Sequence, residues 1–213
     1  MIDALLRRPA GSGEFFADGV RLAVLFSLAA ALLWHGPVDV ALFLLVLGGT
    51  LVSRSLNISR LFDGLYGLTL LTAAWSSVLD LYARVSWWDL PVHFAATAVI
   101  AAMTYFLLAR VGVVTAPEGG SAPAAARVAV PVLVLSLGLA VSVLWELGEW
   151  WGNAVVDASI NVGYQDTMGD LAAGGLGSLL AGAVMERMIR RNPGQAAPAA
   201  AAAGTPLQRR LHR

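Results

Sequence analysis

Cysteine and lysine are absent from this 213-residue sequence, and charged residues of any kind are scarce. Without cysteine the chain has no disulfide, no thiolate metal ligand and no cysteine nucleophile. All fourteen basic residues are arginine, and 13% of residues are charged against 58% that are hydrophobic. Because a soluble domain carries about a quarter charged residues, this composition excludes an ordinary soluble domain and indicates a membrane protein.

Familiar catalytic and nucleotide-binding signatures are also missing from the sequence. It contains no G-x-S-x-G, no H-E-x-x-H and no Walker loop. Only one histidine, His93, falls inside an apolar run, whereas several intramembrane hydrolase designs need two or more. The arginines lie in short loops and in the tail, so nucleic acid is not an expected partner. No organic cofactor is evident.

Long apolar segments dominate the rest of the chain. A bilayer core is about 30 Å thick and takes roughly 20 helical residues to cross. Six segments approach this length: 20–35, 37–53, 61–82, 90–112, 128–150 and 167–187. The first two are short and meet at His35-Gly36-Pro37. We interpret them as two spans; the alternative interpretation is a hairpin that does not fully cross the membrane. No cleavable signal peptide is evident.

These segments predict an all-α, polytopic helical bundle of about six transmembrane helices. The expected organisation is an N-terminal segment over residues 1–18, a transmembrane domain over 19–190 and an Ala/Pro-rich basic tail over 191–213. Thirteen arginines fall on one side of the predicted spans and only Arg84 on the other. Since basic residues are retained on the cytoplasmic side, both termini of this multi-pass membrane protein are predicted to be cytoplasmic.

Ionisable residues gather at the predicted outer ends of three spans. The pairs are Asp89 with His93, Glu146 with Glu149, and Asp166 with Asp170. Spacings of three or four residues place each pair on one helix face. Ionisable groups inside a membrane avoid lipid and face a bundle interior or a wet cavity, so the three faces are expected to meet in one outer-facing polar site.

Five carboxylates and one imidazole in a small volume repel one another unless they recruit a cation. Oxygen-rich sites with one histidine suit Mg²⁺, Mn²⁺, Ca²⁺ or Zn²⁺. In this hypothesis Glu146 is the catalytic proton carrier, and the metal ligands are Asp89, His93, Glu149, Asp166 and Asp170.

Helix capping is the alternative explanation for some of these acids. Asp89 precedes Leu90-Pro91 and has the position of an N-cap. Thr167 and Asp170 fit a pattern similar to a capping box, and Glu149 has the option of reaching the solvated headgroup layer. Capping does not explain Glu146 or His93, which lie deeper in their segments.

Small residues recur in the sixth segment. Gly174, Ser178 and Gly182 repeat every four residues, and so do Gly169, Ala173 and Gly177. Small residues at this spacing let membrane helices approach closely. Internal packing is the preferred interpretation, and a homo-oligomer contact is the alternative.

Three motifs, in this order, resemble a known family. Trp88-Asp89 with His93, then Trp145-Glu146-Leu147-Gly148-Glu149-Trp150, then Asp166-Thr167-Met168-Gly169-Asp170-Leu171 are similar to the YjdF-type bacterial inner-membrane proteins, which are uncharacterised and distantly VanZ-like. The resemblance covers roughly residues 60–187. It implies a polytopic helical membrane protein with the six ionisable residues at motif positions, and it supplies no reaction.

Three functions therefore stay open. In the first, the chain binds a divalent cation at its outer side and acts on lipid or cell-envelope substrates, with the metal as Lewis acid or water activator. In the second, it is a cation- or proton-coupled transporter of small solutes, although no inverted repeat is evident. In the third, it is a structural or accessory membrane subunit. Whether the protein is an enzyme is not decided by the sequence.

Overall fold

The computed structural model describes residues 8–56, 58–114, 124–158, 160 and 162–191. Over these residues the chain is helical, with no strand. The helices are α2 (Ser12–Trp34), α3 (Pro37–Leu56), α4 (Arg60–Val78), α5 (Leu81–Arg84), α6 (Asp89–Arg110), α7 (Ala124–Val155) and α8 (Tyr164–Arg191). The predicted all-α class is confirmed.

Five of these helices are long and apolar enough to cross a membrane, namely α2, α3, α6, α7 and α8. The sixth long helix, α4, has 19 residues and is not among them. It begins with Arg60 and Asp63 and carries hydroxyl residues further along. The helical membrane architecture is thus confirmed, while the count of six crossings stays a prediction.

Helix boundaries differ from the predicted segments in several places. The joint at His35-Gly36-Pro37 is confirmed, with Pro37 as the first residue of α3, a position that suits proline. The predicted third span, 61–82, is wrong at its end, because α4 stops at Val78 and Asp80 takes a left-handed conformation with φ of 52°. In the other direction, α2 begins at Ser12, within the segment assigned to 1–18. Residues 192–213 of the predicted tail lie outside the described residues.

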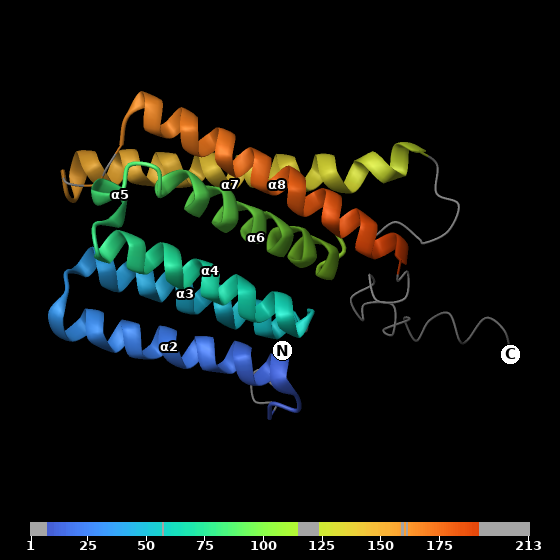
Figure 1. Cartoon of the computed structure of the whole chain (residues 1–213), viewed down its shortest axis with the longest axis horizontal. Helices are drawn as coiled ribbons and strands as arrows, with labels where there is room; N and C mark the ends of the chain where they lie inside the picture. Colours follow the sequence, from blue (N-terminus) through green and yellow to red (C-terminus); the bar gives the residue numbers. More distant parts are fainter. Residues whose placement is uncertain (1–7, 57, 115–123, 159, 161, 192–213) are drawn as a thin grey trace, which may run out of the picture.

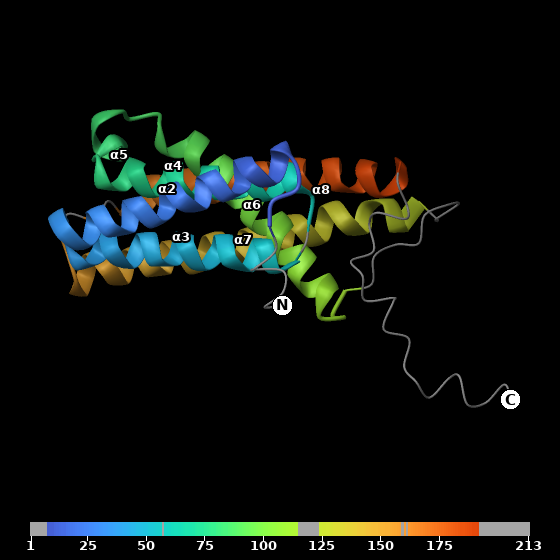
Figure 2. The ribbon, with the colours of Figure 1, turned by 90° about the horizontal axis from the view of Figure 1, so that it is seen from below.

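The six long helices alternate in direction and form two groups that lie side by side (Figures 1 and 2). In one group α2, α3 and α4 pack together around Val24, Phe43 and Ala74. In the other, α6, α7 and α8 pack around Ala101, Val134 and Met185. Contacts between α4 and α6 join the groups. The start of α2 and the end of α8 lie at the same end of the bundle, which we call the arginine end.

Glycines of α8 allow this helix to lie close to both of its neighbours. A methyl group at Gly177 would overlap the main-chain carbonyl of Phe94 in α6, and one at Gly182 would lie 2.7 Å from Cα of Pro131 in α7. At Gly174 it would lie 2.7 Å from the Ser142 hydroxyl. These glycines therefore serve internal packing, the preferred interpretation of the sequence, and an oligomer contact through α8 would have to use other residues.

Membrane orientation is testable with reporter fusions. We expect a C-terminal alkaline phosphatase fusion to be inactive and a fusion between α7 and α8 to be active, because thirteen of the fourteen arginines are predicted to be cytoplasmic. The measurement is phosphatase activity in whole cells, with green fluorescent protein fusions at the same two positions as controls. An active C-terminal phosphatase fusion would contradict both the orientation and the outer placement of the acids.

Candidate metal site

Three ligand-type side chains converge where α6 and α8 begin. Asp89, His93 and Asp170 each offer one atom within 4.8 Å of the others. His93 Nε2 lies 3.3 Å from Asp89 Oδ1 and 3.9 Å from Asp170 Oδ2. Two ligands bound on opposite sides of one ion at 2.0–2.6 Å are about 4–5 Å apart, so a single cation fits between these atoms. We call Asp89, His93 and Asp170 the Asp–His–Asp cluster.

Helix geometry explains why the cluster forms. Asp89 and His93 are four residues apart on α6 and share a face, and that face packs against α8. Asp170 is 2% exposed because it lies on the face of α8 that carries Gly174 and Gly177, where the helices approach most closely. The close approach of the helices at Gly174 and Gly177 thus brings the carboxylate of Asp170 on α8 to His93 on α6.

Glu146 of α7 is buried beside the cluster. Its exposed fraction is 6%, and neither carboxyl oxygen has a hydrogen-bond partner of ordinary geometry among the described residues. It interacts electrostatically with His93 and Asp170, and Thr167 is also close to it. A buried carboxyl group without a partner is costly. Glu146 is therefore the group in the site with the strongest need for a proton or a cation.

The remaining two predicted ligands lie at the edge of the cluster. Glu149 is half-buried and interacts electrostatically with Glu146 and His93. Asp166 is half-buried on the first turn of α8 and interacts with Glu146 and Asp170. All six predicted residues therefore lie in one electrostatic neighbourhood, but only Asp89, His93 and Asp170 have the separations of ligands to one ion.

Neither Asp89 nor Asp170 is a helix cap, so the capping explanation is wrong for these two aspartates. The N-cap of α6 is Trp88, so Asp89 is already inside the helix, and its carboxylate faces His93. Helix α8 begins at Tyr164, which places Thr167 and Asp170 within the helix rather than at a capping box. Both helices begin before the position that an N-cap residue at Asp89 or Thr167 would need. The carboxylates of Asp89 and Asp170 contact His93 instead.

A layer of buried hydroxyl groups lies one or two helical turns deeper. Thr97, Ser142 and Ser178 are buried on α6, α7 and α8, four or eight residues from His93, Glu146 and Asp170. The Thr97 and Ser142 hydroxyls are 3.4 Å apart, and the Ser178 hydroxyl donates to the Gly174 carbonyl at 2.8 Å. Thr97 and Ser142 were not predicted to belong to the site, although each lies four residues from a predicted site residue, His93 or Glu146.

Tyr82 of α5 lies on the side of the cluster that faces α4. It interacts with the charges of Asp89, Glu149 and Asp170. Burial raises the pKa of the Tyr82 hydroxyl well above its ordinary value, and the negative charge of Asp89 raises it further. The hydroxyl therefore stays protonated and donates to the Ala73 carbonyl at 3.0 Å, which holds α5 against α4.

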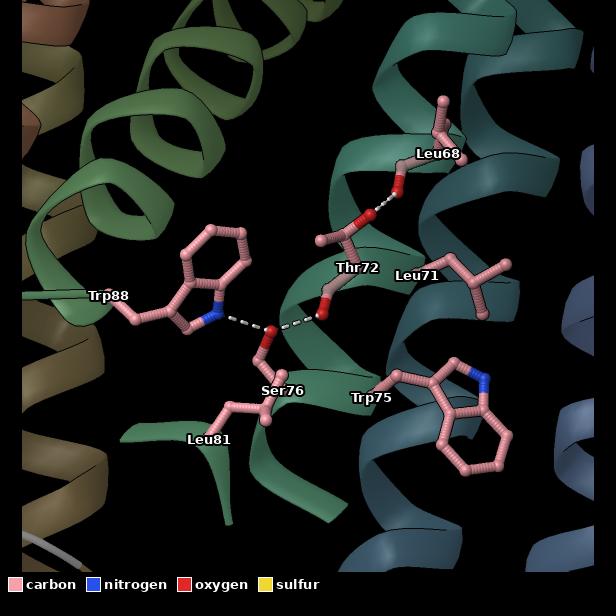
Figure 3. A pocket seen from close by; sticks show the side chains of 7 residues that line it. All are labelled: Leu68, Leu71, Thr72, Trp75, Ser76, Leu81 and Trp88. Atoms are coloured by element: carbon pink, nitrogen blue, oxygen red, sulfur yellow. Dashed lines mark hydrogen bonds between the residues drawn. The ribbon is translucent and has the colours of Figure 1, made fainter. Parts of the chain in front are cut away.

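A pocket of about 270 Å³ lies next to this tyrosine. We call it the α4 pocket; it is lined by Leu68, Leu71, Thr72, Trp75, Ser76, Leu81 and Trp88 (Figure 3). The Trp88 indole donates to the Ser76 hydroxyl at 2.9 Å, and Ser76 donates to the Thr72 carbonyl at 2.7 Å. Trp88 directly precedes Asp89 in the chain, and Tyr82 interacts both with Ser76 of the pocket and with Asp89 of the cluster.

A second buried polar network, which was not predicted from the sequence, lies at the arginine end. Arg21 is one of the thirteen arginines predicted to lie on the cytoplasmic side, but it lies inside α2 and is buried. Its guanidinium donates to the Thr50 carbonyl of α3 at 3.1 Å and pairs with Asp63 of α4 at 2.5 Å. Asp18 pairs with Arg21 and with Arg54. This network joins α2, α3 and α4.

The chain matches a known protein family over most of its length. The family described as "Predicted membrane protein (DUF2238)" matches residues 19–191, a range that contains the cluster, Glu146 and the glycines of α8. No curated protein and no solved structure matches the chain. The YjdF-type and VanZ-like resemblances gain no support beyond membership of a membrane-protein family.

Proposed function

Since the chain belongs to the DUF2238 family of predicted membrane proteins, we propose that it is a multi-pass protein of the bacterial inner membrane that binds one divalent cation at Asp89, His93 and Asp170. The observation that carries the proposal is the separation of their ligand atoms, all within 4.8 Å. Glu146 beside them, whose carboxyl oxygens have no hydrogen-bond partner of ordinary geometry among the described residues, supplies the proton-carrying group. Two carboxylates and one imidazole are a donor set that Mg²⁺, Mn²⁺, Ca²⁺ and Zn²⁺ accept.

The proposed activity follows from the place of the site. Under the predicted orientation the cluster faces the outer leaflet, where lipid headgroups and envelope precursors are available. A bound cation polarises a phosphoryl or carbonyl oxygen or lowers the pKa of a bound water. Glu146 then takes or gives the proton, while Glu149 and Asp166 add negative charge that favours retention of the cation.

The cation proposal predicts a specific loss on substitution. We expect stoichiometric Mn²⁺ or Zn²⁺ in the purified wild-type protein. Loss of a residue that only hydrogen-bonds to a metal ligand lowers metal affinity by roughly 10- to 100-fold. Asp170→Asn and His93→Ala remove a ligand itself, so each should lower cation affinity by more than this. The measurement is elemental analysis in detergent with calorimetric titration of the added ion. Because the ligands must be deprotonated, affinity should be weaker at pH 5 than at pH 8.

Two further variants sharpen this experiment. Asp80→Asn is the matched control, because Asp80 is also near the predicted outer end but is 73% exposed and lies outside the cluster. Glu146→Gln should retain the cation and change the number of protons released on binding, which calorimetry in buffers of different ionisation enthalpy measures. Absence of stoichiometric cation from the wild type, or equal loss in Asp80→Asn, would favour the accessory-subunit function instead.

A cation- or proton-coupled transporter is the second candidate, because the polar groups continue inward. Thr97, Ser142 and Ser178 follow the acids into the bundle, and the buried hydroxyl of Tyr105 has no partner among the described residues. Tyr105 is buried eight residues further along α6 than Thr97, about 12 Å deeper in the bundle. Uptake of a pH-sensitive dye by proteoliposomes that carry the chain distinguishes this function from an envelope enzyme.

A further inference from the structure

The α4 pocket has the chemistry of a site for hydrocarbon. Its side-chain donors are all used within the protein: Thr72 donates to the Leu68 carbonyl, Ser76 to the Thr72 carbonyl, Trp88 to Ser76 and Trp75 to Ser27. The rest of the lining is leucine and indole carbon. A polar ligand would find no free donor here, whereas an apolar chain loses nothing on entering.

The direction of the pocket matches that of a lipid chain. It runs along α4 from Ser76 to Leu68 (Figure 3), eight residues that span about 12 Å of helix. Ser76 is at the end held by Trp88, and Tyr82 interacts both with Ser76 and with the charge of Asp89 in the Asp–His–Asp cluster. Leu68 is at the other end of the pocket and is 43% exposed, and the neighbouring Leu65 is 44% exposed. This end of the pocket therefore opens on an apolar face of α4.

We propose that the α4 pocket holds one acyl chain of a membrane phospholipid whose headgroup phosphate reaches the cation of the Asp–His–Asp cluster. This assignment rests on the proposed function, for which it names the substrate class. Phosphate oxygens are hard ligands that complete the coordination of a divalent cation, and the single residue step from Trp88 to Asp89 connects chain and headgroup. The surrounding bilayer supplies the lipid directly, from the side of α4.

A photoreactive lipid tests the assignment. The probe is a phospholipid with a diazirine in one acyl chain, in vesicles of phosphatidylethanolamine and phosphatidylglycerol that contain the full chain and Mn²⁺. We expect the label, mapped by peptide mass spectrometry, to concentrate on Leu68 and Leu71. Thr72→Trp fills the pocket and should reduce this labelling several-fold. Thr69→Trp is the matched control, because Thr69 also bonds to the carbonyl four residues back but does not line the pocket.

The headgroup and the cation are tested separately. A diazirine alkane without a headgroup should label the same residues more weakly than the phospholipid does in the wild type. In Asp170→Asn, which lacks a ligand of the cation, the two probes should label these residues to the same extent. Calorimetry should give the same Mn²⁺ affinity for Thr72→Trp, Thr69→Trp and the wild type. If Mn²⁺ binds normally while labelling is uniform around the bundle, the acyl-chain site is refuted and the cation site stands. If Mn²⁺ does not bind, the proposed function is refuted by that measurement alone.

Discussion

Replacement of Gly177 by alanine is expected to lower the free energy of unfolding by about 3 kcal/mol, at the upper end of the range for overpacked interiors. The added methyl group would overlap the main-chain carbonyl oxygen of Phe94 and would lie 2.9 Å from the carbonyl carbon of the same residue. A main-chain atom of a neighbouring helix cannot rotate away as a side chain does, so α6 and α8 must separate. The measurement is unfolding of the purified protein in detergent.

Gly148→Ala is the matched control for this substitution. Gly148 is also helical, but a methyl group there meets no atom within 4 Å, so alanine should be neutral or slightly stabilising because of its higher helix propensity. Gly112 is unsuitable as a control, since its φ of 79° penalises any side chain. Equal stability of the Gly177→Ala and Gly148→Ala variants would refute close contact between α6 and α8, and with it the position of Asp170 beside His93.

Arg21→Met is expected to destabilise the chain by about 3–5 kcal/mol, the usual effect of removing one partner from a buried ion pair. The substitution leaves Asp63 buried without its guanidinium, and it removes both donors to the Thr50 carbonyl. Methionine keeps an unbranched chain of similar length, so loss of packing contributes little. The measurement is the same unfolding experiment in detergent.

The double variant Arg21→Met with Asp63→Leu separates charge from packing. When both charges are replaced by apolar residues of similar size, much of the lost stability should return. Arg54 still pairs with Asp18 in this variant, so the rest of the network keeps its balance. A double variant less stable than either single variant would show that shape, and not the unpaired charge, dominates at Asp63.

Much of the site was predictable because it follows from local spacing. Asp89 and His93 are four residues apart, and the cost of an ionisable group in lipid makes each such face turn inward. The same reasoning placed Asp170 and Glu146 nearby. Spacing alone does not distinguish a metal ligand from a nearby residue, so Glu149 and Asp166 were predicted to be ligands as well. In the structure the atoms close enough together to bind one ion are those of Asp89, His93 and Asp170.

Features that depend on partners far away in the chain were beyond the sequence. Asp63 follows Arg21 by 42 residues, and no local pattern connects them. Without that connection Arg21 resembles the other flanking arginines, and the first helix was predicted to begin near residue 20 instead of at Ser12. Similarly, the end of α4 at Val78 depends on the left-handed Asp80, a conformation that an aspartate adopts but does not require.

The buried Arg21 network sets a condition on how the chain is inserted during synthesis. When α2 emerges from the ribosome, Thr50 and Asp63 have not yet emerged, so Arg21 has none of its partners from α3 and α4. A lone arginine within a helix resists partition into lipid by about 2.5–3.5 kcal/mol on insertion scales. We therefore expect α2 to remain at the translocation channel until α4 is complete, so that the three helices pass into the bilayer together with Arg21 and Arg54 paired to Asp18 and Asp63.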